Sequence, residues 1–330
     1  MNSSVAPSMQ HEPQHTDPMP SAPEPSPLEL GSTQQTAPIT QFEKQPIDWI
    51  NTLFIGAAHL AAVWAVLHMV FVKFSWATVA VGLVWMAACS LSITGGYHRL
   101  FSHPTYKAIA PLRFFYLLFG AASVQNSALK WSSDHRIHHT ETDTPSDPYN
   151  IIQGFWWAHI GWVLHKSPRG LQESRVKDLN ADPLVRFQHR WYMPLALLMA
   201  VIVPASLGAL WGDALGAVLV AGFLRLVIQW HSTFAVNSVA HYIGDRPYCL
   251  TNTARDSFIT AVITLGEGYH SFHHRFQSDY RNGVRWYHLD PTKWWVWSLS
   301  KVGVCKDLKR VPTAAIQRAR DAVEAELRSA

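Results

Sequence analysis

Two short stretches of the chain each place three histidines within five residues. They read HRIHH, from His135 to His139, and HSFHH, from His270 to His274. Side chains three or four residues apart share one face of a helix, so each stretch would present two or three imidazoles to one place. Neutral imidazole is a good ligand for Fe, Zn, Cu and Ni. The two motifs therefore predict a metal site.

Three further histidines belong to the same set. His98 and His103 stand in HRLFSH, and His241 ends NSVAH. A spacing of five shares a helical face less well, so we expect local unwinding after Gly95-Gly96 to re-aim this pair. The complete set of candidate ligands is His98, His103, His135, His138, His139, His241, His270, His273 and His274.

Nine imidazoles exceed the roughly four to six ligands of one ion, so we expect two ions. The clusters contain no cysteine, which argues against structural zinc and iron–sulfur centres. Nitrogen-rich paired ions beside a lipid phase favour iron and dioxygen chemistry, although the residues alone leave zinc as an alternative. We interpret the other histidines outside the N-terminal tail as interfacial or hydrogen-bonded: His59, His68, His159, His165, His189, His231 and His288.

The elements that position these residues are membrane helices. Four apolar segments are about long enough to span a bilayer, at about 49–72, 76–94, 191–211 and 214–234. Because the links KFSW and GDA are short, the segments should form two antiparallel hairpins. Segments 111–131, 154–165 and 293–297 are apolar but interrupted or short. The first is a possible fifth span, and the other two are expected at the interface.

Lys and Arg settle the expected orientation. Of the 27 Lys and Arg residues, eleven lie from Arg99 to Arg190 and thirteen follow Phe234. Lys73 alone lies in a turn on the other side of the membrane. The positive-inside tendency therefore places both termini and the metal site in the cytoplasm. The fold expected is an all-α integral membrane protein, with four transmembrane helices in two hairpins. A cytoplasmic helical cap, 95–190 and 235–310, should hold the di-metal site.

The rest of the sequence bounds the function further. Residues 1–45 are rich in Pro, Ser and Gln and should be disordered, while 311–330 should form a C-terminal helical tail. Three cysteines without CxxC spacing suggest no disulfide framework. Without a basic arm, nucleic acid is not an expected partner.

The motifs together resemble a known family. TGGYHRLFSH (94–103), DHRIHH (134–139), NSVAH (237–241) and GEGYHSFHH (266–274) resemble the membrane-bound Δ9 fatty-acyl desaturases of the stearoyl-CoA type. YRNGVRWYHLDPTKW (280–294) resembles bacterial members, so we expect a bacterial inner-membrane protein. The resemblance implies a desaturase domain over 46–310.

The resemblance also implies the ligand sets. One iron would take His98, His103, His135, His139 and His273. The other would take His138, His241, His270 and His274, with Asn237 reaching it through a water. The reaction implied is an O2-dependent removal of two hydrogens from a saturated long-chain acyl-CoA, which gives a cis double bond. The hydrogens must leave as atoms, because an unactivated methylene has no usable acidity.

Partners and substrate contacts follow from the same resemblance. The sequence shows no haem- or flavin-binding module, so an external electron donor of ferredoxin, rubredoxin or cytochrome b5 type should dock on the cap. Within an acyl tunnel, the resemblance assigns Trp131 and Thr233 to a kink and Asn126 and Asp134 to the thioester end. Met86 and Ser90 should face the far end of the tunnel.

One departure from the family pattern concerns the acyl carrier. Ser133 stands where animal acyl-CoA members have an arginine, and the basic residues of HKSPR (165–169) are weaker than theirs. Loss of a phosphate-binding arginine removes a charge-assisted hydrogen bond. A phospholipid-bound acyl group is therefore an alternative substrate.

Two rival functions stand beside desaturation. A di-iron lipid or alkane hydroxylase would share the oxidant but not the arrangement of motifs. A transporter would line a path through the spans with ionisable residues. The spans hold only Arg225, His59, His68 and His231, which argues against such a path.

Overall fold

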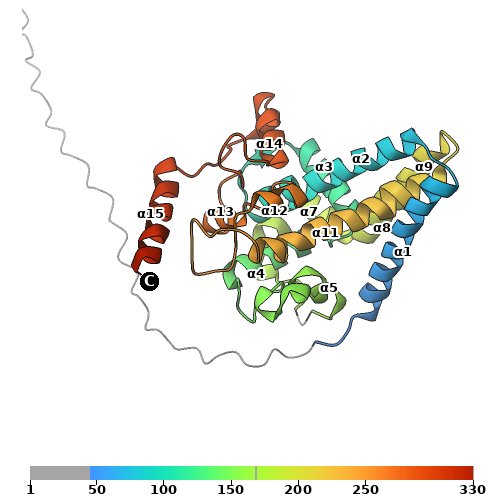
Figure 1. Ribbon diagram of the computed structural model, residues 1–330. Helices are drawn as coiled ribbons and strands as arrows, with labels where there is room; N and C mark the ends of the chain where they lie inside the picture. Colours follow the sequence, from blue (N-terminus) through green and yellow to red (C-terminus); the bar gives the residue numbers. More distant parts are fainter. Residues whose placement is uncertain (1–44, 168, 330) are drawn as a thin grey trace, which may run out of the picture. The chain divides into compact units, whose positions relative to one another are not determined.

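A computed structural model describes residues 45–167 and 169–329, and within them the protein is mostly helical (Figure 1). The tail predicted to be disordered lies outside the described residues except for its last position. The elements before the second hairpin are α1 Trp49–Phe71, α2 Trp76–Leu91, η1 Ser92–Ser102, β1 Lys107–Ala108, α3 Ala110–Ala122, α4 Ala128–Glu141, η2 Ile151–Gln153, η3 Trp157–Gly161, α5 Trp162–Leu164, η4 Glu173–Arg175, α6 Lys177–Asn180 and α7 Pro183–Arg190. Those that follow are α8 Tyr192–Leu197, η5 Leu198–Ile202, α9 Val203–Ala209, α10 Ala214–Ala217, η6 Val218–Leu224, α11 Arg225–Asn237, η7 Val239–His241, α12 Phe258–Ile263, α13 His270–Arg275, α14 Pro291–Lys301, β2 Cys305–Lys306 and α15 Thr313–Ser329.

Four continuous helices in the described part of the protein are long and apolar enough to cross a membrane, which confirms the predicted architecture. They run over Trp49–Phe71, Trp76–Ser102, Tyr192–Ala209 and Ala214–His241. Two of these helices continue past residues 94 and 234, the expected ends of the spans, and their extensions carry His98 and His241.

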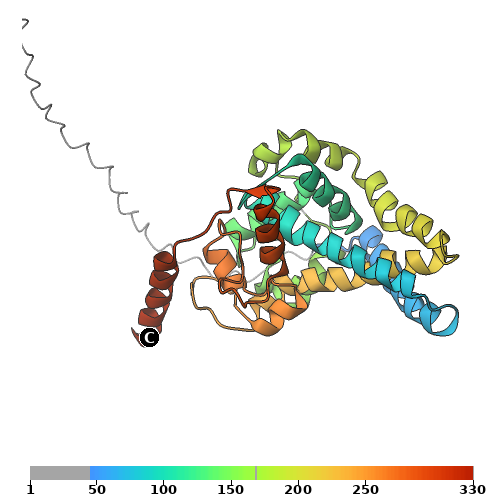
Figure 2. The same cartoon turned by 90° about the horizontal axis from the view of Figure 1, so that it is seen from above.

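The two hairpins contact each other at the short loops that connect their helices. These loops lie at the same end of the helices in two perpendicular views (Figures 1 and 2). The Lys73 ammonium donates to the Gly212 carbonyl at 2.7 Å. One turn further in, the Thr78 hydroxyl donates to the buried Asp213 carboxylate at 2.5 Å. Hydrogen bonds between apolar helices are a main source of association in lipid. These contacts therefore fix how the hairpins meet.

Small residues let the hairpins approach closely. Gly82 of α2 faces Val220 of η6, and a Cβ at position 82 would stand only 2.7 Å from a Val220 methyl group. Glycine lets membrane helices pack closely, which gives them van der Waals contact where lipid provides no hydrophobic drive. A larger residue here would push α2 away from the fourth span.

Segment 111–131 is not a fifth span, because it divides into two helices. α3 ends at Ala122, and the turn that follows places Val124 and Asn126 at positive φ, 48° and 74°. Residues other than glycine rarely adopt positive φ angles, so this turn is a defined break between two helices. α4 then begins at Ala128, capped by the Ser127 hydroxyl. The polar residues Gln125 and Asn126 lie in the turn.

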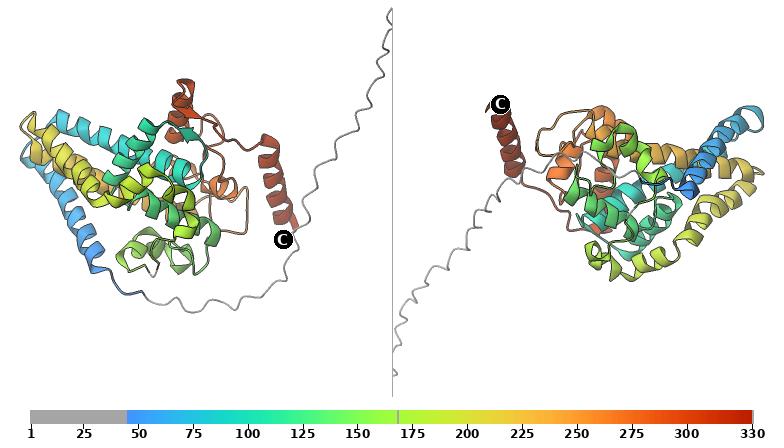
Figure 3. Two further views of the ribbon diagram at one scale, coloured as in Figure 1. Left: turned by 180° about the vertical axis from the view of Figure 1, so that it is seen from behind. Right: turned by 90° about the horizontal axis from the view of Figure 1, so that it is seen from below.

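The cap is built at the other end of the spans from α4, α12, α13 and α14, together with the β1–β2 pair (Figure 3). A buried cluster around Tyr97, Phe101 and Tyr116 joins it to the spans. α15 packs on this cap through Ile316 and Ala319, which contact a cluster containing Tyr248 and Phe272. The segments that carry the histidine motifs are thereby brought together.

Candidate metal centre

The nine predicted ligand histidines form two compact groups in the structure. Within each group, one ring nitrogen of every residue lies within 4.8 Å of all the others. The five-histidine group is His98, His103, His135, His139 and His273, and the four-histidine group is His138, His241, His270 and His274. The two groups have the same members as the two ligand sets that the family resemblance implied. That they hold ions stays a prediction.

Each of the two His-x-x-His-His motifs contributes two histidines to one group and one histidine to the other. On α4, His135 and His139 are four apart and join the five-histidine group, while His138 joins the other group. On α13, His270 and His274 join the four-histidine group, while His273 joins the first. One helical turn thus feeds two sites, because residues four apart share a face and the third histidine points elsewhere. This geometry explains why the motif occurs twice.

His98 and His103 are aligned by a π-helix, which is a locally under-wound helix. η1, Ser92–Ser102, is π-helical, and the His103 amide donates to the His98 carbonyl five residues back at 3.2 Å. Residues five apart then share a face, and the two ring centroids lie 5.1 Å apart. The local unwinding expected after Gly95-Gly96 thus takes this form, and it begins earlier, at Ser92. Gly96 admits the ring of Tyr116 from α3, where a Cβ would stand 2.6 Å from that side chain.

The ring nitrogens within each group face one another. In the first group, Nε2 of His98 lies 2.9 Å from Nε2 of His273, and Nε2 of His103 lies 2.8 Å from Nε2 of His135. In the second, Nε2 of His274 lies 3.0 Å from that of His270. Burial and neighbouring imidazoles lower the pKa of six of these side chains well below its usual value: His103, His135, His139, His270, His273 and His274. They are therefore neutral donors, as metal binding requires.

Three of the histidines have their tautomer fixed by a partner at Nδ1. The Glu267 carboxylate lies 2.9 Å from Nδ1 of His98, and the Asp147 carboxylate lies 2.9 Å from Nδ1 of His138. A carboxylate only accepts, so each Nδ1 carries the proton and each Nε2 presents a lone pair. These two carboxylates were missed from the sequence, because nothing in the spacing of the motifs relates either one to its histidine.

His241 is fixed in the same way through a hydroxyl. Its Nδ1 lies 2.8 Å from the Thr253 hydroxyl, which itself donates to Asp143 at 2.7 Å. The hydroxyl proton is thereby committed, so Nδ1 of His241 must donate. Its Nε2 is buried and has no hydrogen-bond partner among the described residues. An orphaned lone pair aimed into a group of imidazoles fits a metal ion.

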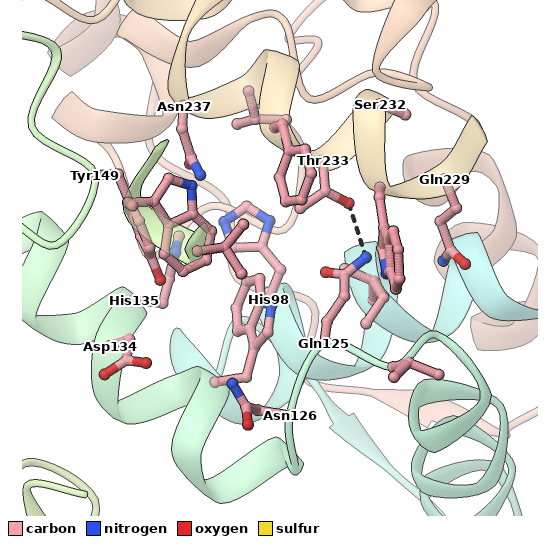
Figure 4. A pocket seen from close by; sticks show the side chains of 18 of the residues that line it. His98, Gln125, Asn126, Asp134, His135, Tyr149, Gln229, Ser232, Thr233 and Asn237 are labelled. Atoms are coloured by element: carbon pink, nitrogen blue, oxygen red, sulfur yellow. Dashed lines mark hydrogen bonds between the residues drawn. The ribbon is translucent and has the colours of Figure 1, made fainter. Parts of the chain in front are cut away.

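A pocket of about 500 Å³ passes both histidine groups. Its lining includes His98 and His135 of the first group and His138 and His270 of the second. Asn237 also lines it and points inward near Tyr149 (Figure 4). The predicted place of Asn237 beside the site is thereby consistent with the structure, and its role as a ligand through a water stays a prediction.

The pocket wall holds five of the six predicted substrate residues: Ser90, Asn126, Trp131, Asp134 and Thr233. Met86 is not part of the lining, although its sulfur accepts from the Ser90 hydroxyl at 3.7 Å. Trp131 stacks on His135, with ring centroids 4.8 Å apart. The Thr233 hydroxyl accepts from the Gln125 amide at 3.1 Å (Figure 4). Gln125, to which no sequence motif assigned a role in the site, is thus a wall residue.

The predicted thioester end holds charged groups of both signs: Asp134 and Lys130 pair there, and Asn126 and Lys130 line a second hollow together with Arg190. Asp134 pairs with Lys130 at 2.5 Å, yet burial raises the pKa of its carboxyl more than Lys130 lowers it. Ser133 is fully buried, and its hydroxyl accepts from the Gln172 amide at 3.1 Å. Position 133 therefore faces the interior of the cap, and its side chain serves packing there.

The fold and site define a class: a multi-span helical membrane protein whose cap brings nine imidazoles into two metal-type groups beside an apolar pocket. The sequence pattern of the family described as fatty acid desaturase matches residues 74–303. The chain belongs to this family. With its four apolar helices, it is an integral membrane protein.

Individual relatives match over most of this protein. It is 45% identical to "Probable acyl-CoA desaturase" of Schizosaccharomyces pombe, over 82% of its own length and 57% of that protein. It is 43% identical to "Acyl-CoA desaturase 1" of Saccharomyces cerevisiae, over 83% of its own length and 54% of that protein. It is 34% identical to "Stearoyl-CoA desaturase" of Homo sapiens, over 81% of its own length and 76% of that protein. The chain thus spans little more than half the length of the two fungal relatives. None of these three is bacterial, and the expected bacterial source stays a prediction.

Proposed function

We propose that the protein is an O2-dependent acyl desaturase that introduces a cis double bond, at the Δ9 position, into a saturated long-chain acyl-CoA at a di-iron centre. The observation that carries the proposal is the pocket that runs past both histidine groups. An extended acyl group in it would lie beside both ions. The curated relatives named acyl-CoA desaturases support this substrate.

The residues present fit a pair of iron ions. Both groups consist of imidazoles with no thiolate, and in each group the ring of one histidine is oriented by a carboxylate. When bound, the iron pair would supply the O2-dependent oxidation that unactivated C–H bonds require. The predicted ligands are the nine histidines, with Asn237 through a water at the four-histidine group.

The protein's own side chains would hold and orient the substrate. Trp131, stacked on His135, and the Gln125–Thr233 bridge form parts of the pocket wall, which also includes the histidines. Such fixed walls place one methylene pair at the ions, which is how a tunnel selects a bond that nothing chemical marks. Asn126 and Asp134 would contact the thioester end. Ser90, deeper in the second span, would meet the methyl end.

Orientation and partners complete the proposal. The distribution of Lys and Arg supports a cytoplasmic cap and cytoplasmic termini. The proposed location in a bacterial inner membrane rests on the motif YRNGVRWYHLDPTKW (280–294) alone. Electrons would come from a ferredoxin, rubredoxin or cytochrome b5 type donor that docks on the cap. An acyl group esterified in a phospholipid is the alternative substrate, since position 133 offers no phosphate contact.

The test is gas chromatography–mass spectrometry of total fatty acids from a host that lacks its own desaturase. The protein is expressed with a compatible electron donor beside two variants, His138→Ala and His68→Gln. His68 lies in the last turn of α1 and serves as the matched histidine control. A cis-monoene made by the parent and by His68→Gln, but not by His138→Ala, is the expected result. Hydroxylated products would establish the hydroxylase instead, and unchanged lipids despite bound iron would reject both enzymes.

A second assay distinguishes the two possible acyl carriers, CoA and phospholipid. Purified protein in nanodiscs receives stearoyl-CoA or, in parallel, distearoyl phospholipid as the disc lipid. The proposal expects product from the CoA ester alone. Product only in the phospholipid would transfer the activity to acyl-lipid.

A further inference from the structure

The C-terminal segment 279–293 packs behind the five-histidine group through one buried carboxylate. Glu267 is 4% exposed and is within hydrogen-bond distance of three side chains, those of the neighbours His98 and Arg99 and that of the distant Asn282. Its Oε2 lies 2.9 Å from Nδ1 of His98 and accepts from the Asn282 amide at 2.6 Å. Its Oε1 accepts from the Arg99 guanidinium at 2.8 Å. A buried carboxylate with three donors is held in one orientation.

Arg99 and Asp290 extend this arrangement. Arg99 is 1% exposed, and besides Glu267 it pairs with Asp290 at 2.9 Å and donates to the Tyr280 carbonyl at 3.0 Å. Asp290 is fully buried and also accepts the backbone amides of Asn282 and Gly283, at 2.9 and 3.0 Å. The turn that presents Asn282 to Glu267 is therefore fixed by Asp290. The network thus joins segment 279–293 to Glu267 directly through Asn282 and indirectly through Asp290 and Arg99, and Glu267 contacts His98.

Glu267 acts as a hydrogen-bond acceptor at Nδ1 of His98, at 2.9 Å. A carboxylate at Nδ1 keeps the proton on that nitrogen, so the Nε2 lone pair faces the group and becomes a stronger donor to a metal ion. Loss of such a partner of a metal-binding histidine typically costs about 10–100-fold in metal affinity.

We propose that Glu267 is a positioning residue for the five-histidine site, and that Asn282, Asp290 and Arg99 hold it against His98. The segment 280–294, whose motif stands apart from the histidine motifs, is then an outer shell of the metal centre. This inference rests on the proposed metal centre. It requires that the two groups bind metal, and it holds whether the reaction is desaturation or hydroxylation.

The test measures metal binding to full-length purified protein, with Co²⁺ as the probe because its visible absorption reports the ligand field. The variants are Glu267→Gln, Asn282→Leu and, as the matched control, Asp279→Asn. Asp279 is a buried carboxylate of the same segment that pairs with Arg281 at 2.7 Å and accepts the Val311 amide at 2.9 Å. Thermal unfolding of the metal-free proteins separates loss of folding from loss of a site.

We expect the parent and Asp279→Asn to bind two Co²⁺ ions per protein molecule with the same spectrum. Glu267→Gln should weaken one of the two ions by about 10-fold or more, and Asn282→Leu by a smaller factor. Two ions bound at parental affinity in both variants would overturn the proposal. If Glu267→Gln does not fold, Asn282→Leu decides, because it leaves both Glu267 and His98 in place.

A double variant shows whether Glu267 acts through His98. If it does, His98→Ala with Glu267→Gln should bind metal no more weakly than His98→Ala alone, since coupled residues are not additive. Additive losses would assign Glu267 to structure alone. A parent that binds two ions but makes no unsaturated product would reject the proposed function and leave this inference standing.

Discussion

The two histidine groups differ in redundancy and in exposure. The five-histidine group has two half-buried members, His103 and His139, whereas all members of the four-histidine group are buried. The smaller group has one imidazole fewer, and Asn237 lies beside the pocket as its predicted indirect ligand. The larger group can lose a ligand and keep four. The difference teaches that the same residue type is not equally dispensable at the two sites, and the following experiments test that asymmetry.

The largest loss should come from the four-histidine group. His270→Ala leaves three imidazoles there and removes a ring that lines the pocket. We expect desaturation to fall by at least about 100-fold, and bound iron to fall toward one ion per protein molecule. Product analysis together with metal analysis checks this. Two retained ions would show that the group has a further ligand.

A smaller loss of activity is expected from a substitution in the five-histidine group. His103→Ala leaves four imidazoles around the first ion, so activity should fall by about 10-fold while two ions are retained at saturating iron. The same product and metal assays apply. An effect as large as that of His270→Ala would remove the asymmetry between the groups.

Acid should release metal, and the five-histidine group, which has two half-buried members, should lose its ion first. In the metal-free protein the pKa values of six histidines are lowered, so below about pH 6.5 the unfolded protein binds more protons than the folded one. Folding stability is therefore complete above this pH and falls as pH decreases, by up to about 1.4 kcal/mol per pH unit for each histidine. Unfolding and metal release followed from pH 8 to pH 5 test this. Loss of both ions in one step would mean that exposure does not distinguish the sites.

The pocket wall beside both groups should show a moderate effect. Thr233→Val keeps the shape but leaves the half-buried Gln125 amide without its partner at 3.1 Å. Loss of such a hydrogen bond costs about 1 kcal/mol, so we expect roughly a fivefold lower rate and a wider spread of double-bond positions. Thr233→Ser, which retains the hydroxyl, is the control. An unchanged spread would exclude the bridge from bond selection.

The smallest effect on rate should come from the far end of the pocket. Ser90→Phe adds volume at a buried lining position, and we expect a shift toward shorter acyl groups with total turnover changed by less than about threefold. Competition between acyl groups of different length, read by mass spectrometry, measures it. Met86→Phe is the comparison, because Met86 lies outside the lining. Equal shifts from both would place Met86 at the pocket.

Helical spacing was enough to predict much of the site. The spans follow from apolar length, and the role of the two His-x-x-His-His motifs follows from the faces of α4 and α13. The division of the histidines into two sets came from the family resemblance, not from spacing. The sequence could not show that Glu267 reaches His98 or that Asp143 reaches Thr253, since these contacts join segments that only tertiary packing brings together. It also placed Met86 and Ser90 on one face, where the pocket lining includes Ser90 alone.

The π-helix at His98 and His103 has one more consequence. A π-helical turn holds one residue more than an α-helical turn, so this segment has the form of a single-residue insertion that the helix absorbed. The interval of five between these histidines thus records the local helix type, whereas α4 and α13 reach the same goal with intervals of three and four. Deletion of one residue between them, with a return to α-helical winding, would leave the two histidines four apart and again on one face. The interval between these histidines and the type of helix that carries them must therefore change together.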